Sequence, residues 1–118
     1  MIIDLDLITK KLVSELENHK VNNLVLYKFD NINSLYDYAL ICSMNNYIQT
    51  KAALDAILKL VKHKLRDSFP SIRVSGEPES GWVIIDLNDL VIHLFEERLR
   101  CFYQLDQLFE TRAVVYHY

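Results

Sequence analysis

The sequence has 118 residues, of which 51% are hydrophobic and 25% are charged, and its formal net charge is -3. Its length fits one domain, spanning 1–118, with enough apolar residues for a sizeable core. The acidic balance argues against a non-specific nucleic-acid binder, because such proteins carry a basic excess. No sequence-specific nucleic-acid partner is expected either. No apolar run approaches the roughly 20 residues that cross a bilayer, and the first residues lack the basic region of a signal peptide.

The two cysteines, Cys42 and Cys101, fall inside predicted secondary structure and lack the spacing of metal ligands. We predict that both are buried, reduced thiols. Free thiols are typical of a reducing compartment, so we expect a cytoplasmic protein without a membrane partner.

The first half of the chain predicts two helices and two strands. Apolar residues at helical spacing indicate the helices, and short apolar runs indicate the strands. The helices are expected over 1–20 and 47–67, the strands over 24–29 and 36–42, and a polar connector over 30–34. Asp4 or Asp6 can cap the first helix, and Asn45 or Asn46 can cap the second.

The second half begins with the segment that holds every glycine and proline of the sequence, from Pro70 to Gly81. Strands are expected over 72–75, 82–85 and 90–95, with a tight turn at Asn88-Asp89. A helix over 96–109 follows, whose apolar side carries Leu99, Phe102, Leu105 and Leu108 or Phe109. The tail 110–118 has no recognisable pattern and is expected to be frayed.

These elements follow one another in the order αββαβββα. Helices with one apolar face and strands that are apolar on both sides assemble most economically into a sheet covered by helices. A crossover through the helix at 47–67 makes the strands that it joins parallel. The sequence therefore predicts an α/β fold with a mixed, five-stranded sheet flanked by helices.

The common catalytic signatures are absent from the sequence: a glycine-rich phosphate loop, a paired-histidine metal helix, CxxC and a nucleophile-elbow serine. His93 lies within an apolar strand, where a core histidine bonded to a carbonyl or carboxylate is favoured over a catalytic one. Asp37, Asp86 and Asp89 could converge at strand ends and hold magnesium. Turn and cap roles explain Asp86 and Asp89 without a metal, so we expect no cofactor.

Trp82 is the only tryptophan and stands at the first position of a strand, directly after a flexible loop. A tryptophan that is half exposed there would suit a binding hot spot, because it buries a large, rigid area. Ordinary core packing explains it equally well. Together, these residues indicate a small binding module without visible catalytic machinery.

Segments throughout the chain resemble the ribosomal silencing factor (Iojap-like) family. The stretch 81–95 reads GWVIIDLNDLVIHLF, and 100–109 reads RCFYQLDQLF. The family pattern is Trp, an apolar run, Asp, a Gly-Asp turn and Val-His, followed by Arg-x-x-Tyr-x-Leu-Glu-x-Leu-Trp. Segment 34–38 is similar to its Ser-Ile-x-Asp-Tyr element, and 74–76 to its Val-Glu-Gly. The resemblance covers about residues 5–109.

Three departures from the family pattern stand out. The Gly-Asp turn is Asn88-Asp89, and the terminal Trp is Phe109. The family's Gly-x-Ser segment after the second strand is replaced by 44–49, which weakens any function assigned to that loop.

The resemblance implies a fold similar to nucleotidyltransferases but a protein that is not an enzyme. Members bind universal large-subunit protein fourteen of the large ribosomal subunit, block joining of the small subunit and thereby repress translation. The family's partner-binding tryptophan corresponds to Trp82. The other partner-binding residues expected by resemblance are Asp86, Asp89, His93, Tyr38 and Tyr103. For Asp86, Asp89 and His93, which lie on the hairpin of Trp82, two roles stay open: contact with the partner, or shaping the hairpin alone.

Two alternatives belong to other functional classes. A nucleotidyltransferase-like enzyme would hold magnesium and a nucleotide on Asp37, Asp86 or Asp89, although the Gly-Ser and Asp-x-Asp motifs of such enzymes are missing. A structural module would form a homodimer, with Trp82 meeting a second copy of itself.

Overall fold

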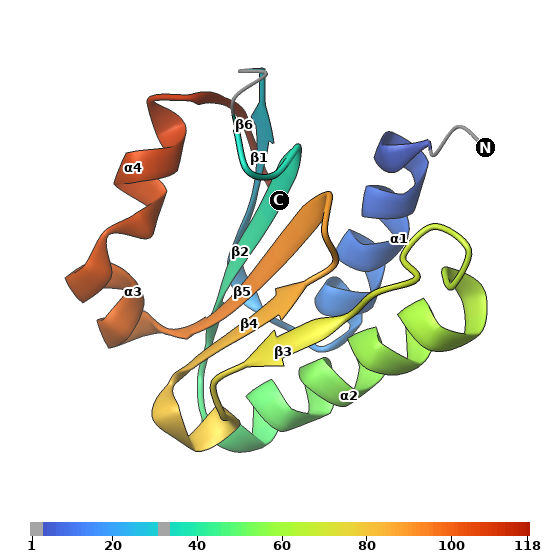
Figure 1. The fold of residues 1–118 in the computed structure, drawn as a ribbon. Helices are drawn as coiled ribbons and strands as arrows, with labels where there is room; N and C mark the ends of the chain where they lie inside the picture. The colour runs from blue at the N-terminus through green and yellow to red at the C-terminus, as the bar shows by residue number, and fades with distance from the viewer. Residues whose placement is uncertain (1–3, 31–33) are drawn as a thin grey trace.

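The computed structural model describes residues 4–30 and 34–118, and Figure 1 shows its arrangement. The start of the predicted helix 1–20 and the centre of the predicted connector 30–34 lie outside these ranges. The helices are α1 (Leu5–Asn18), α2 (Tyr47–Lys64), the 3-10 helix η1 (Pro78–Ser80), α3 (Glu97–Tyr103) and α4 (Leu105–Glu110). The strands are β1 (Asn22–Phe29), β2 (Tyr38–Met44), β3 (Arg73–Ser75), β4 (Trp82–Asp86), β5 (Leu90–Glu96) and β6 (Ala113–His117).

The strands form one mixed sheet in the order β3-β4-β5-β2-β1-β6. Strands β2 and β5 pair in parallel at its centre, and every other pairing is antiparallel. It follows that β2 and β3, which α2 connects, run in the same direction, as the crossover predicted. The α/β class and the mixed sheet flanked by helices are confirmed.

The sheet has six strands rather than the predicted five, because the tail is not frayed. Residues 113–117 form β6, which pairs with β1 from Val25–His117 to Phe29–Ala113. Ala113 and Val115 pack against the apolar cluster beneath α4. A five-residue strand whose partner lies far away in the sequence leaves only a weak local pattern.

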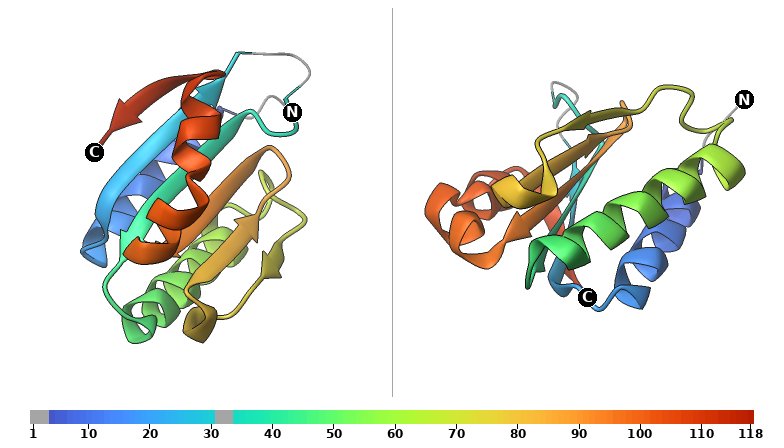
Figure 2. Two further views of the ribbon diagram at one scale, coloured as in Figure 1. Left: turned by 90° about the vertical axis from the view of Figure 1, so that its left-hand side faces the viewer. Right: turned by 90° about the horizontal axis from the view of Figure 1, so that it is seen from below.

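Helices cover both faces of the sheet, as Figure 2 shows: α1 and α2 lie on one face, and α3 and α4 on the other. The larger core lies beneath α1 and α2 and includes Leu12, Leu40 and Ile57, which are fully buried. The smaller core lies beneath α3 and α4 and includes Tyr27 and Phe95. Alternate residues of each strand thus face different cores.

The helix starts agree with the capping signals in the sequence. The Asp4 carboxylate accepts a hydrogen bond from the Leu7 N–H at 3.1 Å, and the Asn46 side chain accepts one from the Gln49 N–H at 2.9 Å. Helix α2 ends at Lys64 rather than at Asp67, because Leu65 leaves the helical backbone conformation, with φ of -120° and ψ of 18°.

The helix predicted over 96–109 is two short helices, α3 and α4, because Gln104 adopts the left-handed conformation with φ of 53°. This break turns the two halves differently against the sheet. Leu105 packs into the core, whereas Phe102 is 76% exposed, so the single predicted apolar face is wrong. Cys101 is also exposed, contrary to prediction, while Cys42 is buried as predicted. No helix in the described ranges is long and apolar enough to cross a membrane.

Candidate functional site

Trp82 begins β4 and turns its indole toward α3, at the border of the smaller core. The ring stacks on Phe95, which is its cross-strand partner, with ring centres 4.4 Å apart. Tyr103 of α3 also contacts the indole, with ring centres 5.0 Å apart. The indole N–H donates to Nδ1 of His93 at 3.1 Å. Trp82 is partly exposed. These contacts nevertheless hold its ring in one orientation.

His93 is 7% exposed and accepts the Trp82 hydrogen bond through Nδ1, which requires that this nitrogen carry no proton. Burial lowers the pKa of His93 to about 4, because the charged ring would lose its hydration; Asp106 opposes this shift. The prediction of a core histidine is confirmed, but its partner is an indole N–H rather than a carbonyl or carboxylate. His93 orients Trp82.

The three aspartates considered as magnesium ligands, Asp37, Asp86 and Asp89, lie at or next to the turn between β4 and β5. The Asp86 carboxylate accepts hydrogen bonds from the Asn88 N–H at 2.9 Å and from the Tyr36 hydroxyl at 2.7 Å. Asn88 has φ of 80°. The Asp89 carbonyl accepts from the Asp37 N–H at 2.9 Å. Within residues 4–30 and 34–118, no group of three His, Cys, Asp or Glu side chains could hold a metal ion.

The predicted partner-binding residues divide into three places. Trp82, His93 and Tyr103 come together in one aromatic cluster. Asp86 and Asp89 lie at the far end of the same hairpin. Tyr38 lies on the opposite face of the sheet, where its hydroxyl donates to Asp6 of α1. A partner that docks on Trp82 can therefore reach Tyr103, but Tyr38 belongs to another surface.

A buried ion pair that sequence reasoning missed holds α3 and α4 against the sheet. Arg100 is 9% exposed, and its Nε and Nη2 donate to the Asp106 carboxylate at 2.9 and 3.0 Å. Its Nη1 donates to the Asn23 carbonyl at 2.7 Å and to the Ser43 hydroxyl at 2.9 Å. The Tyr27 hydroxyl also donates to Asp106, at 2.5 Å. All three guanidinium nitrogens of Arg100 thus donate to acceptors of the protein.

These contacts shift the titration of the pair. Burial alone would raise the pKa of Asp106, but hydrogen bonds from Arg100 and Tyr27 outweigh it and hold the pKa below its usual range. Burial and the bond to Asp106 raise the pKa of Tyr27. The sequence offered little signal, because Arg100 follows the charged residues Glu96, Glu97 and Arg98 and stands six residues before Asp106, a spacing that does not pair within one helix.

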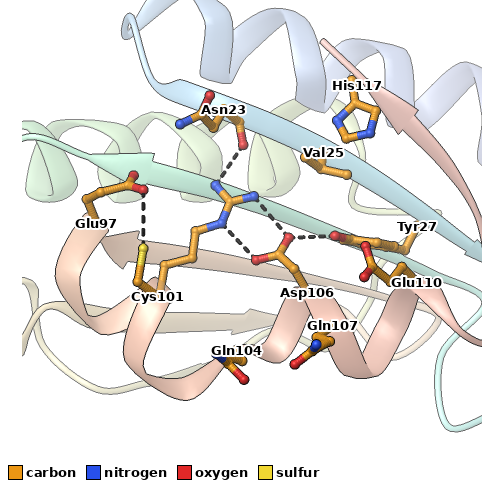
Figure 3. Close-up of a pocket in the computed structure, with 11 residues that line it drawn as sticks. Asn23, Val25, Tyr27, Glu97, Cys101, Gln104, Asp106, Gln107, Glu110 and His117 are labelled. Carbon is orange, nitrogen blue, oxygen red and sulfur yellow. Dashed lines mark hydrogen bonds and ion pairs between the residues drawn. The ribbon is translucent and has the colours of Figure 1, made fainter.

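A cavity of about 590 Å³ lies beside this ion pair, between α3, α4 and the strands β1 and β6 (Figure 3). Its wall is mixed, and its charged or titratable residues include the acids Glu97, Asp106 and Glu110 together with Arg100 and His117. The Arg100 guanidinium is occupied by its own partners, so it is not free to bind a phosphate in this cavity.

Comparisons by sequence and by structure match this chain to the same group of proteins. The family described as "Ribosomal silencing factor during starvation" matches residues 4–116. A ribosomal silencing factor from Halalkalibacterium halodurans is 28% identical over 103 residues, covering 87% of this chain and 86% of that protein. A mouse protein named for mitochondrial assembly of the ribosomal large subunit is 29% identical over 77 residues, covering 65% of this chain and 34% of its own length.

A solved structure agrees with these sequence matches. A crystal structure of a Bacillus halodurans protein superposes with a TM-score of 0.70 at 28% identity, covering 87% of this chain and 93% of that one. The family match extends over nearly the whole chain, and it includes both the Trp82 hairpin and the Arg100–Asp106 pair. The chain belongs to the ribosomal silencing factor family.

Proposed function

We propose that this protein represses translation by docking the Trp82 hairpin on universal large-subunit protein fourteen of the large ribosomal subunit, which blocks joining of the small subunit. It acts in the cytoplasm as a binding protein and makes or breaks no bond. The relatives support the ribosomal setting, since one is named for large-subunit assembly and others as silencing factors.

The observation that carries this proposal is the fixed, partly exposed indole of Trp82. Its hydrogen bond to His93 and its contacts with Phe95 and Tyr103 hold the ring in place before a partner arrives. A preordered side chain loses little conformational entropy on binding. Tyr103, which is 53% exposed, and Phe102 extend the apolar surface beyond the indole. Buried aromatic anchors of this kind dominate the energy of many interfaces.

The charge around Trp82 favours a basic protein as the partner. Between Glu77 and Glu110 the chain has eight acidic residues and only two arginines. Arg100 and Asp106 neutralise each other in their buried ion pair, which leaves seven acidic residues and one arginine in this segment. Two of the seven, Asp86 and Asp89, lie at the far end of the hairpin from Trp82. An acidic surface attracts a basic ribosomal protein and speeds the encounter, and it repels the phosphates of ribosomal RNA.

The same charges oppose the nucleotide-binding alternative. In nucleotide-binding folds, phosphate binds at a helix N-terminus beyond a strand end. Here side chains of the chain itself occupy part of the N-terminus of α2: the Asn46 side chain accepts from the Gln49 N–H at 2.9 Å, and Gln49 Oε1 accepts from the Asn45 N–H at 2.7 Å. A cavity of about 200 Å³ beside it is lined by Glu79 and Glu96, whose carboxylates repel phosphate.

The experiment is sedimentation of the protein with isolated large subunits, followed by addition of small subunits. We expect the protein to travel with the large subunit and to reduce formation of the complete ribosome. The Trp82→Ala variant should lose about 2 kcal/mol or more of binding, a roughly 30-fold weaker association. Protein that stays at the top of the gradient while the subunits join normally would contradict the proposal.

Two tyrosines of equal exposure provide a matched control. Tyr103 and Tyr118 are each 53% exposed, but only Tyr103 contacts Trp82. We expect Tyr103→Ala to weaken binding to the large subunit and Tyr118→Ala to leave it unchanged. Circular dichroism of each variant separates loss of the interface from loss of the fold. Equal effects of the two substitutions would show that the docking surface lies elsewhere.

A further inference from the structure

The two halves of the chain differ in charge. Residues 1–66, which include α1 and α2, hold nine lysines and arginines against seven acids, a net charge of +2. Residues 67–118, which include α3 and α4, hold four against nine, a net charge of -5. These helix pairs cover opposite faces of the sheet (Figure 2). An acidic total therefore does not exclude a nucleic-acid contact on the α1 and α2 side.

The positive excess is concentrated at the end of α2. Residues 59–66 read KLVKHKLR and contain Lys59, Lys62, Lys64 and Arg66, with His63 among them and no acid. All five side chains are exposed. The helix dipole favours cations in the last turn of a helix. It therefore explains Lys62 and Lys64, but not Lys59 or any cation that another helix brings to the same place.

Helix α1 runs antiparallel to α2, which brings its first turns beside this basic end. Gln49, in the first turn of α2, donates through Nε2 to the carbonyls of His19 and Lys20, which follow α1, each at 3.0 Å. The start of α2 is thus fastened to the end of α1. It follows that the end of α2 lies beside the start of α1.

A groove of about 480 Å³ lies between the two helices at this place. Its wall contains three lysines, Lys10 and Lys11 of α1 and Lys64 of α2, together with two leucines and a serine. Glu15 is the one acid among the lining residues, and its carboxylate accepts a hydrogen bond from the Asn18 side-chain amide at 3.3 Å. Cations from two helices therefore converge on one groove.

These cations have no acidic partner within the chain. In the part of the chain that the structure describes, residues 4–30 and 34–118, the ion pairs involve Lys28, Arg98 and Arg100. None of them engages the lysines of the groove or the cations of 59–66. Neighbouring like charges repel one another, and a bound polyanion relieves this repulsion. The surface is thus complementary in charge to a row of phosphates.

We propose that this basic surface, formed by Lys10, Lys11, Lys59, Lys62, Lys64 and Arg66, binds the phosphate backbone of double-helical RNA without reading its sequence. All but one of these residues are lysines, whose flexible point charges suit phosphates better than the edges of bases. No aromatic side chain lines the groove. The groove therefore lacks the stacking platform on which proteins hold unpaired bases, which favours a paired RNA.

The choice of RNA over other polyanions rests on the proposed function, because a protein that docks on the large subunit is surrounded by ribosomal RNA. Trp82 packs on the α3 side of the sheet, whereas the basic surface lies on the α1 and α2 side. A protein partner and an RNA helix can therefore be bound at the same time. Two such contacts hold the protein more tightly than either contact alone.

The test is fluorescence anisotropy of a labelled RNA hairpin with a fully paired stem, titrated with the whole chain at several salt concentrations. We expect a dissociation constant of about 10–100 μM at about 0.1 M salt, as in other sequence-independent binding. The logarithm of the binding constant should fall linearly with the logarithm of the salt concentration, with a slope of about -3 for three neutralised phosphates. An unpaired RNA of the same length should bind more weakly.

Two variants with the same change of charge locate the contact. Lys11→Glu/Lys64→Glu reverses two charges of the basic surface, and Lys20→Glu/Lys51→Glu reverses two exposed lysines at the opposite end of the helix pair. Lys51 stands 13 residues before Lys64, about 20 Å along the helix axis and about twice the screening length at 0.1 M salt. We expect the first variant to raise the dissociation constant about tenfold or more and the second to change it less than about threefold.

A neutral variant controls for stability. Lys64→Glu places an acid at the end of α2, where the helix dipole disfavours it. Lys11→Gln/Lys64→Gln removes the same two cations without adding an acid, and it should weaken RNA binding by an intermediate factor. Circular dichroism and thermal unfolding confirm that each variant retains its fold.

Failure of this proposal is distinguishable from failure of the proposed function, because the hairpin titration contains no ribosome. Trp82→Ala should bind the hairpin as the unmodified protein does, and Lys11→Glu/Lys64→Glu should still bind purified universal large-subunit protein fourteen. Absence of binding to the hairpin, or equal losses in the two charge-reversal variants, would overturn the proposal. So would tighter binding to the unpaired RNA, or binding to phosphatidylglycerol vesicles in place of RNA.

Discussion

The indole N–H of Trp82 donates to Nδ1 of His93 across the β4–β5 hairpin, at 3.1 Å. The partly exposed aromatic residue is therefore oriented by a buried one. Because only an unprotonated Nδ1 can accept this bond, the orientation of Trp82 depends on the neutral form of His93.

This dependence predicts a loss of stability in mild acid. The pKa of His93 is about 4 in the folded protein and about 6.5 when unfolded, so the unfolded chain binds a proton first as the pH falls. The contribution of neutral His93 to the free energy of unfolding amounts to about 3 kcal/mol. It is complete above pH 6.5 and declines as the pH falls toward 4.

Urea unfolding at a series of pH values measures this effect, and His93→Phe is the control. We expect the variant to lack the part of the acid-dependent loss between pH 6.5 and 4 that His93 causes. Identical pH profiles for the variant and the unmodified protein would refute the assignment.

A second prediction concerns the ion pair beneath α3 and α4. Replacing Arg100 by Met removes the donors to Asp106, Ser43 and the Asn23 carbonyl, and it leaves the Asp106 charge uncompensated. Breaking a buried pair from one side costs about 3–5 kcal/mol, and denaturant unfolding would show this loss.

The matched control is Arg98→Met, two residues earlier. The Arg98 side chain is 90% exposed, and it contacts Glu96 at 3.1 Å. Exposed pairs contribute little, so we expect a change below about 1 kcal/mol. Equal losses for the two arginines would mean that burial of Arg100 does not determine its role.

The turn at Asn88 gives a third prediction. Its φ of 80° lies in the left-handed region, which glycine adopts freely and β-branched residues avoid. Asn88→Gly should change the melting temperature little, whereas Asn88→Val should cost about 1–2 kcal/mol. If both variants had the melting temperature of the unmodified protein, the turn would have another conformation in solution.

The sequence predicts those elements whose signal is local. Asp4 and Asn46 mark helix starts through caps within their own first turn, and the apolar runs of β4 and β5 flank a turn that suits Asn88. The break at Gln104 was missed because a glutamine carries no preference for a left-handed backbone. Strand β6 was missed because its stability comes from pairing with β1.

The same distinction applies to the site. Trp82 stood out by its rarity and position, and the hairpin that pairs it with Phe95 was predicted. The Arg100 contacts could not be predicted from neighbouring residues in the sequence, because Arg100 is 77 residues from Asn23 and 57 residues from Ser43. The turn role predicted for Asp86 is confirmed, because its carboxylate accepts the Asn88 N–H two residues along. Asp89 takes part in the turn through its backbone, whose carbonyl accepts from the Asp37 N–H.

Because Trp82 is the only tryptophan of the chain, all indole fluorescence of this protein arises at the surface proposed to meet the partner. Its emission responds to the water around the ring and to the charge of the adjacent His93. The protein therefore contains its own optical probe. Binding to a purified partner without tryptophan can be followed by light emission alone, with no label attached to either protein.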